Sequence, residues 1–316
     1  MFTVNSSTGR IAALLVCLLT ALATPLSSHA DERSAVDDRK QAFADADAAK
    51  LVGPKDIPLA GQAVLHLPAG EVFIPQPQAA RMLVAMGNPG THGDLQGLVF
   101  PQSEQDQWFA TVRYIASGYV KDGDAKEWDA DEMLKSFREG TEEANAERQK
   151  MGIPAMEIVG WAEKPTYDAT AHRLVWAMSS RDKGAPADAA QGVNYNTYAL
   201  GREGYISLNL ITGLNELPGE KHYAHELLSA LDFNEGKRYA DFNSSTDHVA
   251  EYGLAALVLG VGAKKLGLLA IAFGFLAKFA KLGVLLLAGI GAGAAKLFGR
   301  KKKTVEATTP VEPPQA

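Results

Sequence analysis

Clustered carboxylates are the first group of residues whose types and spacing could do chemistry. Asp122 and Asp124 flank a glycine, and Asp129 and Asp131 follow closely. Oxygen-rich clusters of this kind suit a hard cation such as Ca²⁺. The calcium-loop pattern is broken, because the fifth, sixth and twelfth positions from Asp122 are Lys126, Glu127 and Met133. The other interpretation is a solvated turn that leads into the acid-favouring start of a helix.

Two histidines one helical turn apart form the second group. His222 and His225 share one face of an expected helix, with Glu226 beside them. Two imidazoles could begin a zinc site, and a neighbouring carboxylate could act as a base. The order His-x-x-His-Glu matches neither His-Glu-x-x-His nor its inversion, and the sequence indicates no third ligand. Solvated histidines on a helix surface are the competing interpretation, and we predict no metal site.

Signals for nucleophilic catalysis and for nucleotide binding are missing from the sequence. It contains no Gly-x-Ser-x-Gly elbow, and Ser117 and Ser207 lie in strand-like runs. The segment from Leu200 to Gly204 is typical of a hairpin turn rather than a phosphate-binding loop. We therefore expect no cofactor. Paired carboxylates for glycan hydrolysis stay open, because their separation depends on the fold.

A mixture of aromatic rings with amide and guanidinium donors could bind sugars or peptide termini. The candidate ligand-binding residues are Trp161, Tyr167, Trp176, Asn194, Asn196 and Arg202, with Tyr195 and Tyr198 among them in the sequence. In the competing interpretation the aromatic rings fill the core of a sheet and the two asparagines hold turns. A single pocket lined by these side chains would favour binding.

Period-two and period-3.6 patterns indicate the elements that would position these residues. We expect a hairpin from 63–67 and 71–74, strands over 95–100 and 108–120, and helices over 78–86, 129–151 and 217–231. Two further hairpins are expected, one from 156–161 and 172–179 around a turn at 165–169, the other from 195–200 and 205–211. Because hairpins outnumber crossovers, the sequence predicts an α+β fold with a mainly antiparallel sheet and flanking helices.

A series of ordered motifs resembles the domain of unknown function 2167 family. The similarity covers roughly residues 61–267. The matching runs are Gly97 to Pro101, Gly118 to Ala125, Gly160-Trp161, His172 to Ala177, Asn194 to Asn196, Leu200 to Arg202, and Phe233, Gly236 and Tyr239 with Asp247 and Tyr252-Gly253. The resemblance implies an uncharacterised bacterial membrane-anchored protein. It implies no catalytic or ligand-binding residues.

The first 30 residues are typical of a secretory signal peptide. A single early charge, Arg10, precedes an apolar run from Ile11 to Leu22, and small residues at Ser28 and Ala30 suit signal peptidase. A retained anchor is the alternative, but the apolar run is about 12 residues where a span needs about 20. Cys17, the only cysteine, is expected to leave with the signal, so the mature chain would have no disulfide.

Charge is divided unevenly along the rest of the chain. Residues 31–250 hold 34 Asp and Glu against 21 Lys and Arg, whereas residues 251–316 hold 3 against 9. The acidic first part argues against nucleic acid as a partner. We expect residues 31–250 to form one periplasmic α+β domain.

The last part predicts attachment to the lipid bilayer. Residues 251–281 are predicted as an amphipathic or interfacial helix, with Lys264, Lys278 and Lys296 on one helical face, and 282–299 as a transmembrane helix. Residues 300–316 would be a cytoplasmic, disordered tail whose basic cluster sets the topology: Arg300, Lys301, Lys302 and Lys303. Two crossings fit by length but would place that cluster outside.

These features predict a bacterial inner-membrane protein with a single span. Its glycine- and alanine-rich helix could allow self-association, with flexible filler as the alternative. We expect a non-enzymatic periplasmic binding or interaction module with an envelope protein partner. The alternative is an envelope hydrolase that acts on a wall or lipid component.

Overall fold

The computed structural model describes residues 27–259, apart from 89, 104, 127 and 151, and the side chains from residue 37 onward. The apolar core of the predicted signal, the predicted span and the basic cluster at 300–303 lie outside the described residues. None of the helices within 27–259 combines the length and apolar character that a membrane crossing requires.

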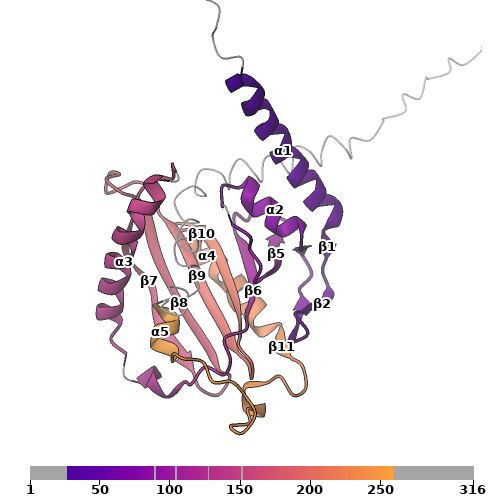
Figure 1. The fold of residues 1–316 in the computed structure, drawn as a ribbon, viewed down its shortest axis with the longest axis vertical. Coiled ribbons are helices and arrows are strands. Elements are labelled where there is room, and N and C mark those ends of the chain that lie inside the picture. Colours follow the sequence, from indigo (N-terminus) through magenta and orange to yellow (C-terminus); the bar gives the residue numbers. More distant parts are fainter. Residues whose placement is uncertain (1–26, 89, 104, 127, 151, 260–316) are drawn as a thin grey trace, which may run out of the picture.

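Two antiparallel sheets and their helices make up the fold (Figure 1). The large sheet has eight strands in the order β1-β4-β5-β6-β10-β9-β8-β7, and the small sheet has three in the order β11-β3-β2. Their bounds are β1 Leu51–Val52, β2 Lys55–Leu59, β3 Ala63–Leu67, β4 Glu71–Pro75, β5 Leu95–Pro101, β6 Phe109–Ile115, β7 Met156–Asp168, β8 Arg173–Asp182, β9 Gly192–Leu200, β10 Tyr205–Gly213 and β11 Leu231–Phe233. The helices are α1 Ser27–Ala49, α2 Gln78–Ala85, α3 Ala130–Lys150, α4 Leu217–Ser229 and α5 Leu254–Val258, with 3₁₀ turns at Gly123–Lys126 and Tyr239–Asp241. The predicted α+β class with a mainly antiparallel sheet is confirmed.

The two faces of the large sheet are covered differently. On one face, the α4 face, helix α4 and the small sheet share a continuous apolar core with inward residues such as Phe73, Val112 and Leu208. On the other, the α3 face, two separate clusters form. One lies under α1 and α2 around Met82 and Leu98, and the other lies under α3 and α5 around Phe137 and Trp176. In Figure 1, α3 and α5 stand to the left of the central strands and α1 and α2 to the right.

Helix α3 begins where its sequence predicts. The Asp129 carboxylate accepts hydrogen bonds from the backbone N–H groups of Asp131 and Glu132 at 2.8 and 3.1 Å, which is an N-cap. Met133 and Phe137, one turn apart, are buried against the sheet. Asn145 then fixes the helix to β7, because its amide exchanges two hydrogen bonds of 2.9 Å with the backbone of Met156.

The hairpin predicted from 63–67 and 71–74 is wrong. Both strands exist, but β3 pairs with β2 and β11 in the small sheet, whereas β4 pairs with β1 and β5 in the large one. The connection through Gly70, which has a φ of 87°, carries the chain from one sheet to the other. Packing the two sheets face to face buries Leu65 and Phe73 in one core, which edge-to-edge pairing would not do.

Two other strands end at positions that differ from the prediction. β7 continues through Pro165 to Asp168, so its turn to β8 lies at 169–172 rather than 165–169. A proline is tolerated there because β7 is an edge strand and its register shifts between Glu163 and Thr166. The strand predicted over 108–120 ends at Ile115, and Gly118 has a φ of 83°.

Two helices had no separate prediction. Helix α1 has little apolar periodicity, and it contacts α2 through the Asp45–Arg81 ion pair at 2.6 Å and the buried Ala46. Helix α5 falls inside the predicted interfacial segment. The carboxylate of Asp124 accepts hydrogen bonds from the backbone N–H groups of Leu254 and Ala255 at 3.0 and 3.1 Å, so a distant loop caps this helix.

Candidate functional site

A band of polar side chains crosses the middle of the α3 face. It consists of Thr111, Arg113, Asn194, Asn196, Tyr198, Ser207 and Asn209, and is called the polar band below. The strand registers set these residues side by side in rows. One row runs Thr111, Asn209, Asn196, and the next runs Arg113, Ser207, Tyr198. Polar residues therefore occupy the positions at which a covered sheet face would carry apolar ones.

Two amide oxygens of the polar band are enclosed without a partner. The side-chain Oδ1 atoms of Asn194 and Asn209 are buried and accept no hydrogen bond within the described residues. The amide of Asn196, which lies opposite Asn209 in the strand register, donates to the backbone carbonyl of Asn194 at 3.2 Å. An enclosed carbonyl oxygen without a donor costs about 1–3 kcal/mol. The polar band therefore contains two hydrogen-bond acceptors that the described residues leave without a donor.

One end of the polar band is charged and the other is aromatic. Arg113 donates to Asp94 at 2.6 Å, and both side chains are partly exposed. Tyr198 stacks on Tyr205 with ring centroids 4.9 Å apart and meets Trp176 edge-on at 4.6 Å. Burial raises the pKa of Tyr198 to about 12, so its hydroxyl keeps its proton at neutral pH.

Apolar side chains border the polar band on both sides. In the row that contains Asn194, the neighbours are Ile211 with Phe109 on one side and Met178 on the other. Phe109 and Ile211 belong to the cluster under α1 and α2, and Met178 belongs to the one under α3 and α5. An amphipathic partner with hydrogen-bond donors would match this surface.

The structure brings part of the predicted ligand-binding set together. Trp176, Asn194, Asn196 and Tyr198 lie on the α3 face at or beside the polar band. Tyr195 points to the opposite face, where its hydroxyl lies 2.8 Å from His225 Nε2.

Trp161 and Tyr167 lie on the edge strand β7 and not in the polar band. Trp161 donates from its indole N–H to the carbonyl of Ala130 at 2.9 Å, at the start of α3. Tyr167 donates from its hydroxyl to Asp122 at 2.8 Å, and His172 Nδ1 is 3.1 Å from the same hydroxyl. Burial and the nearby Asp122 raise the pKa of Tyr167 far above its ordinary value.

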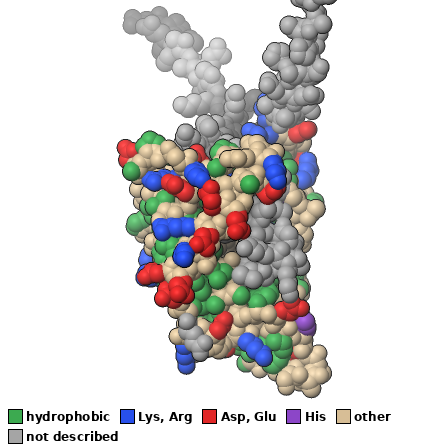
Figure 2. Space-filling model, turned by 60° about the vertical axis from the view of Figure 1, so that its left-hand side comes forward, with side chains coloured by type: hydrophobic (Ala, Val, Ile, Leu, Met, Phe, Trp, Pro, Cys, Tyr) green, Lys and Arg blue, Asp and Glu red, His purple; other side chains and the backbone are tan. Residues whose placement is uncertain are grey.

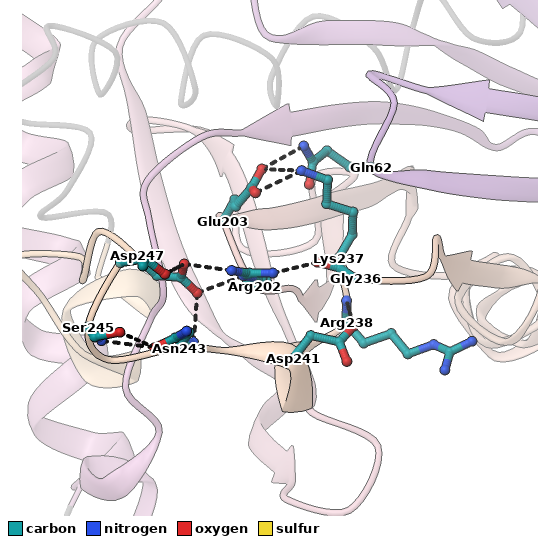
Figure 3. Close-up of polar contacts among 11 residues, drawn as sticks. Gln62, Arg202, Glu203, Gly236, Lys237, Arg238, Asp241, Asn243, Ser245 and Asp247 are labelled. Atoms are coloured by element: carbon teal, nitrogen blue, oxygen red, sulfur yellow. Dashed lines mark hydrogen bonds and ion pairs between the residues drawn. The ribbon is translucent and has the colours of Figure 1, made fainter.

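Arg202 lies at the β9–β10 turn, where Figure 3 shows its guanidinium between two neighbouring segments. It donates two hydrogen bonds to the Asp247 carboxylate at 2.7 and 2.8 Å and a third to the carbonyl of Gly236 at 3.2 Å. The hydrogen bonds from Arg202 and from the backbone N–H of Asn243 hold the pKa of Asp247 well below its usual range. Beside this pair, the ammonium group of Lys237 donates a hydrogen bond to the Glu203 carboxylate at 2.7 Å. Arg202 therefore fastens the turn to the segment that follows β11.

The clustered carboxylates of the sequence have separate partners. Asp122 accepts from Tyr167, Asp124 caps α5, and Asp129 caps α3. Within the described residues, no group of three or more His, Cys, Asp or Glu side chains is placed to hold a metal ion. His225 meets Tyr195, and His222 lies on the exposed side of α4 against the Tyr223 ring at 3.9 Å.

Two acids with raised pKa values are enclosed on the α4 face. Glu71 is 3% exposed and neither of its carboxylate oxygens has a partner among the described residues. Burial, with the charge of Glu226, raises the pKa of Glu71 to about 8. Burial also raises the pKa of Glu220, whose carboxylate accepts from Thr212 and from the backbone N–H of Gln107. Because both acids are enclosed, they do not favour hydrolysis of a polymer.

Sequence reasoning missed three members of the polar band completely: Thr111, Arg113 and Asn209. A usable signal was present, since polar residues alternate with apolar ones in 110–113 and again in 206–210. That alternation normally marks a solvated face. Only the pairing of β6 with β10 places the two polar sets together.

The outer surface around α3 carries charges of both signs. Figure 2 shows acidic and basic side chains interspersed on this side of the molecule. Several form ion pairs, such as Lys183 with Glu142 and Arg181 with Glu157. A mixed surface of this kind lacks the positive stripe that is typical of a nucleic-acid interface.

Comparison with known proteins gives a family match and a distant structural likeness. The family model described as "Protein of unknown function (DUF2167)" matches residues 52–291. No curated protein matches the chain. The solution structure of cyanobacterial PsbP (CyanoP) from Synechocystis sp. PCC 6803 is 11% identical over 58% of this chain and 91% of that chain, with a TM-score of 0.34.

Proposed function

The chain belongs to the DUF2167 family of proteins of unknown function, and from that premise we propose that it is a membrane-anchored envelope protein that binds a polypeptide partner on its polar band. The proposed placement is the bacterial inner membrane, with residues 31–250 in the periplasm. Residues 282–299 would span the bilayer, with Arg300 to Lys303 in the cytoplasm. The apolar run that stops at this basic cluster supports the orientation.

The observation that carries the binding role is the pair of enclosed amide oxygens on Asn194 and Asn209. A sheet face that had only to be packed would place apolar residues there. A polypeptide partner supplies N–H or ammonium donors to these oxygens. Its apolar side chains would meet the borders formed by Ile211 and Met178. A non-enzymatic binding module fits this arrangement.

The anchor is tested by extraction and by a reporter. Membranes that contain the full-length protein are washed with carbonate, and a reporter that is active only outside the cytosol is fused after Ala316. The proposal expects the protein to stay with the membrane and the reporter to be silent. Release into the wash, or an active reporter, would contradict it.

The binding role is tested by crosslinking in cells and recovery of the full-length protein. An envelope protein should be recovered with the wild type and lost with Asn209→Ala. The matched control is Asn215→Ala, an exposed asparagine on the α4 side of the chain, which should behave as wild type. Thermal unfolding of each variant verifies the fold. Equal recovery with Asn209→Ala, or none above the membrane anchor expressed without the domain, would refute a partner-binding face.

A further inference from the structure

A second group of polar and aromatic side chains lies outside the polar band, around the turn between β7 and β8. It is called the His172 site below and consists of Asp122, Tyr167 and His172 with the rings of Tyr119, Tyr239 and Phe242. His172 has a φ of 51°, in the left-handed region that non-glycine residues seldom occupy. Backbone strain of this kind persists only where surrounding contacts fix the residue, and it is concentrated at functional sites.

The hydrogen bonds of the His172 site determine which ring nitrogen carries the proton. The Tyr167 hydroxyl donates its one hydrogen to Asp122 Oδ2 at 2.8 Å. His172 Nδ1 lies 3.1 Å from the same hydroxyl oxygen and 3.7 Å from Asp122 Oδ2, so only the hydroxyl is within hydrogen-bond range. Because that hydroxyl has no second hydrogen, Nδ1 must be the donor. In the neutral imidazole, Nε2 then has a free lone pair.

Two acceptor atoms of the site are available to a ligand. Neither His172 Nε2 nor Asp122 Oδ1 forms a hydrogen bond with any described residue. The two side chains are 28% and 31% exposed, so both are accessible from solvent. A pair of acceptors requires a ligand that has donors, and a carboxylate group has none.

Four stacked rings support the site from one side. Phe242 stacks on Tyr119 with ring centroids 3.8 Å apart, Tyr119 on Tyr239 at 4.4 Å, and Tyr239 on His172 at 4.1 Å. The hydroxyl of Tyr239 donates to the carbonyl of Val120 at 2.9 Å, which fixes the middle of the stack. Among the described residues, the second face of His172 has no ring partner. The imidazole is therefore a rigid ring with one face that another ring can cover.

The charges around the site disfavour an anion. Asp122 and Asp168 both place negative charge near the Tyr167 hydroxyl, and Arg173 lies near Asp168. An organic cation would be compatible with these charges, but an ammonium group has no ring face for the stack. A sugar ring combines neighbouring hydroxyl donors with an apolar C–H face and has no charge. It therefore matches the acceptors, the stacked rings and the charge together.

We propose that the His172 site binds a neutral sugar ring. One hydroxyl group of the sugar donates to His172 Nε2, a neighbouring hydroxyl donates to Asp122 Oδ1, and the apolar face of the sugar packs on the imidazole. Tyr167 is a positioning residue, because it does not touch the sugar but holds the proton of His172 on Nδ1. This site is separate from the polar band, so either one can fail while the other stands.

The position of the proton is tested by NMR of the full-length protein in detergent, with ¹⁵N-labelled histidine. The spectra are recorded near pH 8.5, well above the ordinary histidine pKa of about 6.5. Signals of His172 are identified by their loss in His172→Asn, since asparagine tolerates a positive φ. The proton should be on Nδ1 in the wild type, and Tyr167→Phe should move part of it to Nε2. A proton on Nε2 in the wild type would overturn the proposal.

Binding is tested by calorimetric titration with maltotriose and with a trimer of N-acetylglucosamine. The wild type should bind at least one of them, and His172→Asn should lose binding. Tyr167→Phe removes no atom that touches the sugar and should weaken binding about 2- to 10-fold, the range of one neutral hydrogen bond. The matched control is His66→Asn. His66 also pairs with an acid, Asp56, at 2.7 Å, but it lies outside the ring stack, so this variant should bind as the wild type does.

Three results would refute a sugar site. They are no binding of either trimer by the wild type, equal binding by the wild type and His172→Asn, and binding of n-butylammonium chloride at His172 in place of both trimers. The last result would assign the site to an organic cation. Thermal unfolding of each variant verifies the fold. If His172→Asn is unfolded, Tyr167→Phe decides, and an unchanged affinity with an altered tautomer would refute the hydrogen bond to Nε2.

Discussion

Replacement of Glu71 by glutamine is expected to stabilise the protein at neutral and alkaline pH. The Glu71 side chain, on β4, is buried on the α4 face of the sheet. Its two carboxylate oxygens have no partner among the described residues. Burial raises its pKa from 4.5 to about 8. The folded protein therefore keeps a proton on Glu71 at pH values at which the unfolded chain has lost it.

The sign of the pH dependence follows from this difference. Between pH 4.5 and about 8 the folded state binds more protons than the unfolded state, so the free energy of unfolding falls as the pH rises. The slope is about 1.4 kcal/mol per pH unit for one group. The loss reaches about 3 kcal/mol near neutral pH and has an upper limit of about 5 kcal/mol above the folded pKa.

Glu71→Gln removes the titration and keeps the size of the side chain. Below the ordinary glutamate pKa the variant and the wild type should differ by less than about 1 kcal/mol, since both then bury a neutral polar group. Their difference should widen with rising pH. Two controls are available on exposed acids. Glu226→Gln removes the second cause of the raised pKa and should have a smaller effect, and Glu143→Gln should have none.

The assay is urea unfolding followed by tryptophan fluorescence at a series of pH values, in the full-length protein. Trp108, on the same face of the sheet as Glu71, is buried and reports the loss of this core. Parallel stability curves for wild type and Glu71→Gln across the whole series would refute the reasoning. They would mean that the ionised carboxylate has a compensating partner.

Three further changes test single contacts. Asn145→Ala should lower the free energy of unfolding by about 1–3 kcal/mol in chemical denaturation, because it leaves the buried backbone N–H and C=O groups of Met156 without hydrogen-bond partners. The control Glu143→Ala, at an exposed position, should not lower it. Asp124→Ala removes the cap of α5 and should speed hydrogen exchange at the Leu254 and Ala255 amides, a local cost of about 1 kcal/mol, while Asp129→Ala should leave those amides unchanged. The lowered pKa of Asp247 stabilises the fold above the ordinary aspartate pKa, and this stabilisation is lost as the pH falls through the lowered pKa. Asp247→Asn should therefore flatten the acid side of the profile of thermal stability against pH. An unchanged profile would show that the ion pair with Arg202 contributes nothing to stability there.

Local patterns were sufficient for many elements of the fold. The alternation in 205–211, the cap at Asp129 and the helix over 78–86 each depend on residues close in sequence, and the structure confirms all three. The partition of strands between two sheets was not predictable in the same way. A short connection such as 68–70 joins paired and unpaired strands equally well, and the choice depends on which faces must be buried.

The candidate site was predicted in part for the same reason. Asn194 and Asn196 were identified because their amide groups occur among aromatic residues that are close in sequence. Asn209 was missed because its relation to them requires the register of β9 with β10. Arg202 was identified by its type, but the structure assigns its donors to Asp247, which lies 45 positions later in the sequence.

Sequence patterns alone were enough to assign the family, the antiparallel α+β class and the division of charge between an acidic domain and a basic end. Tertiary structure alone decided that β6 pairs with β10 and that their polar residues join those of β9 in one band. The physical reason is the separation along the sequence over which each interaction acts. Hydrophobic period and helix capping act over a few residues, whereas strand pairing between 109–115 and 205–211 is selected by the burial of the whole sheet.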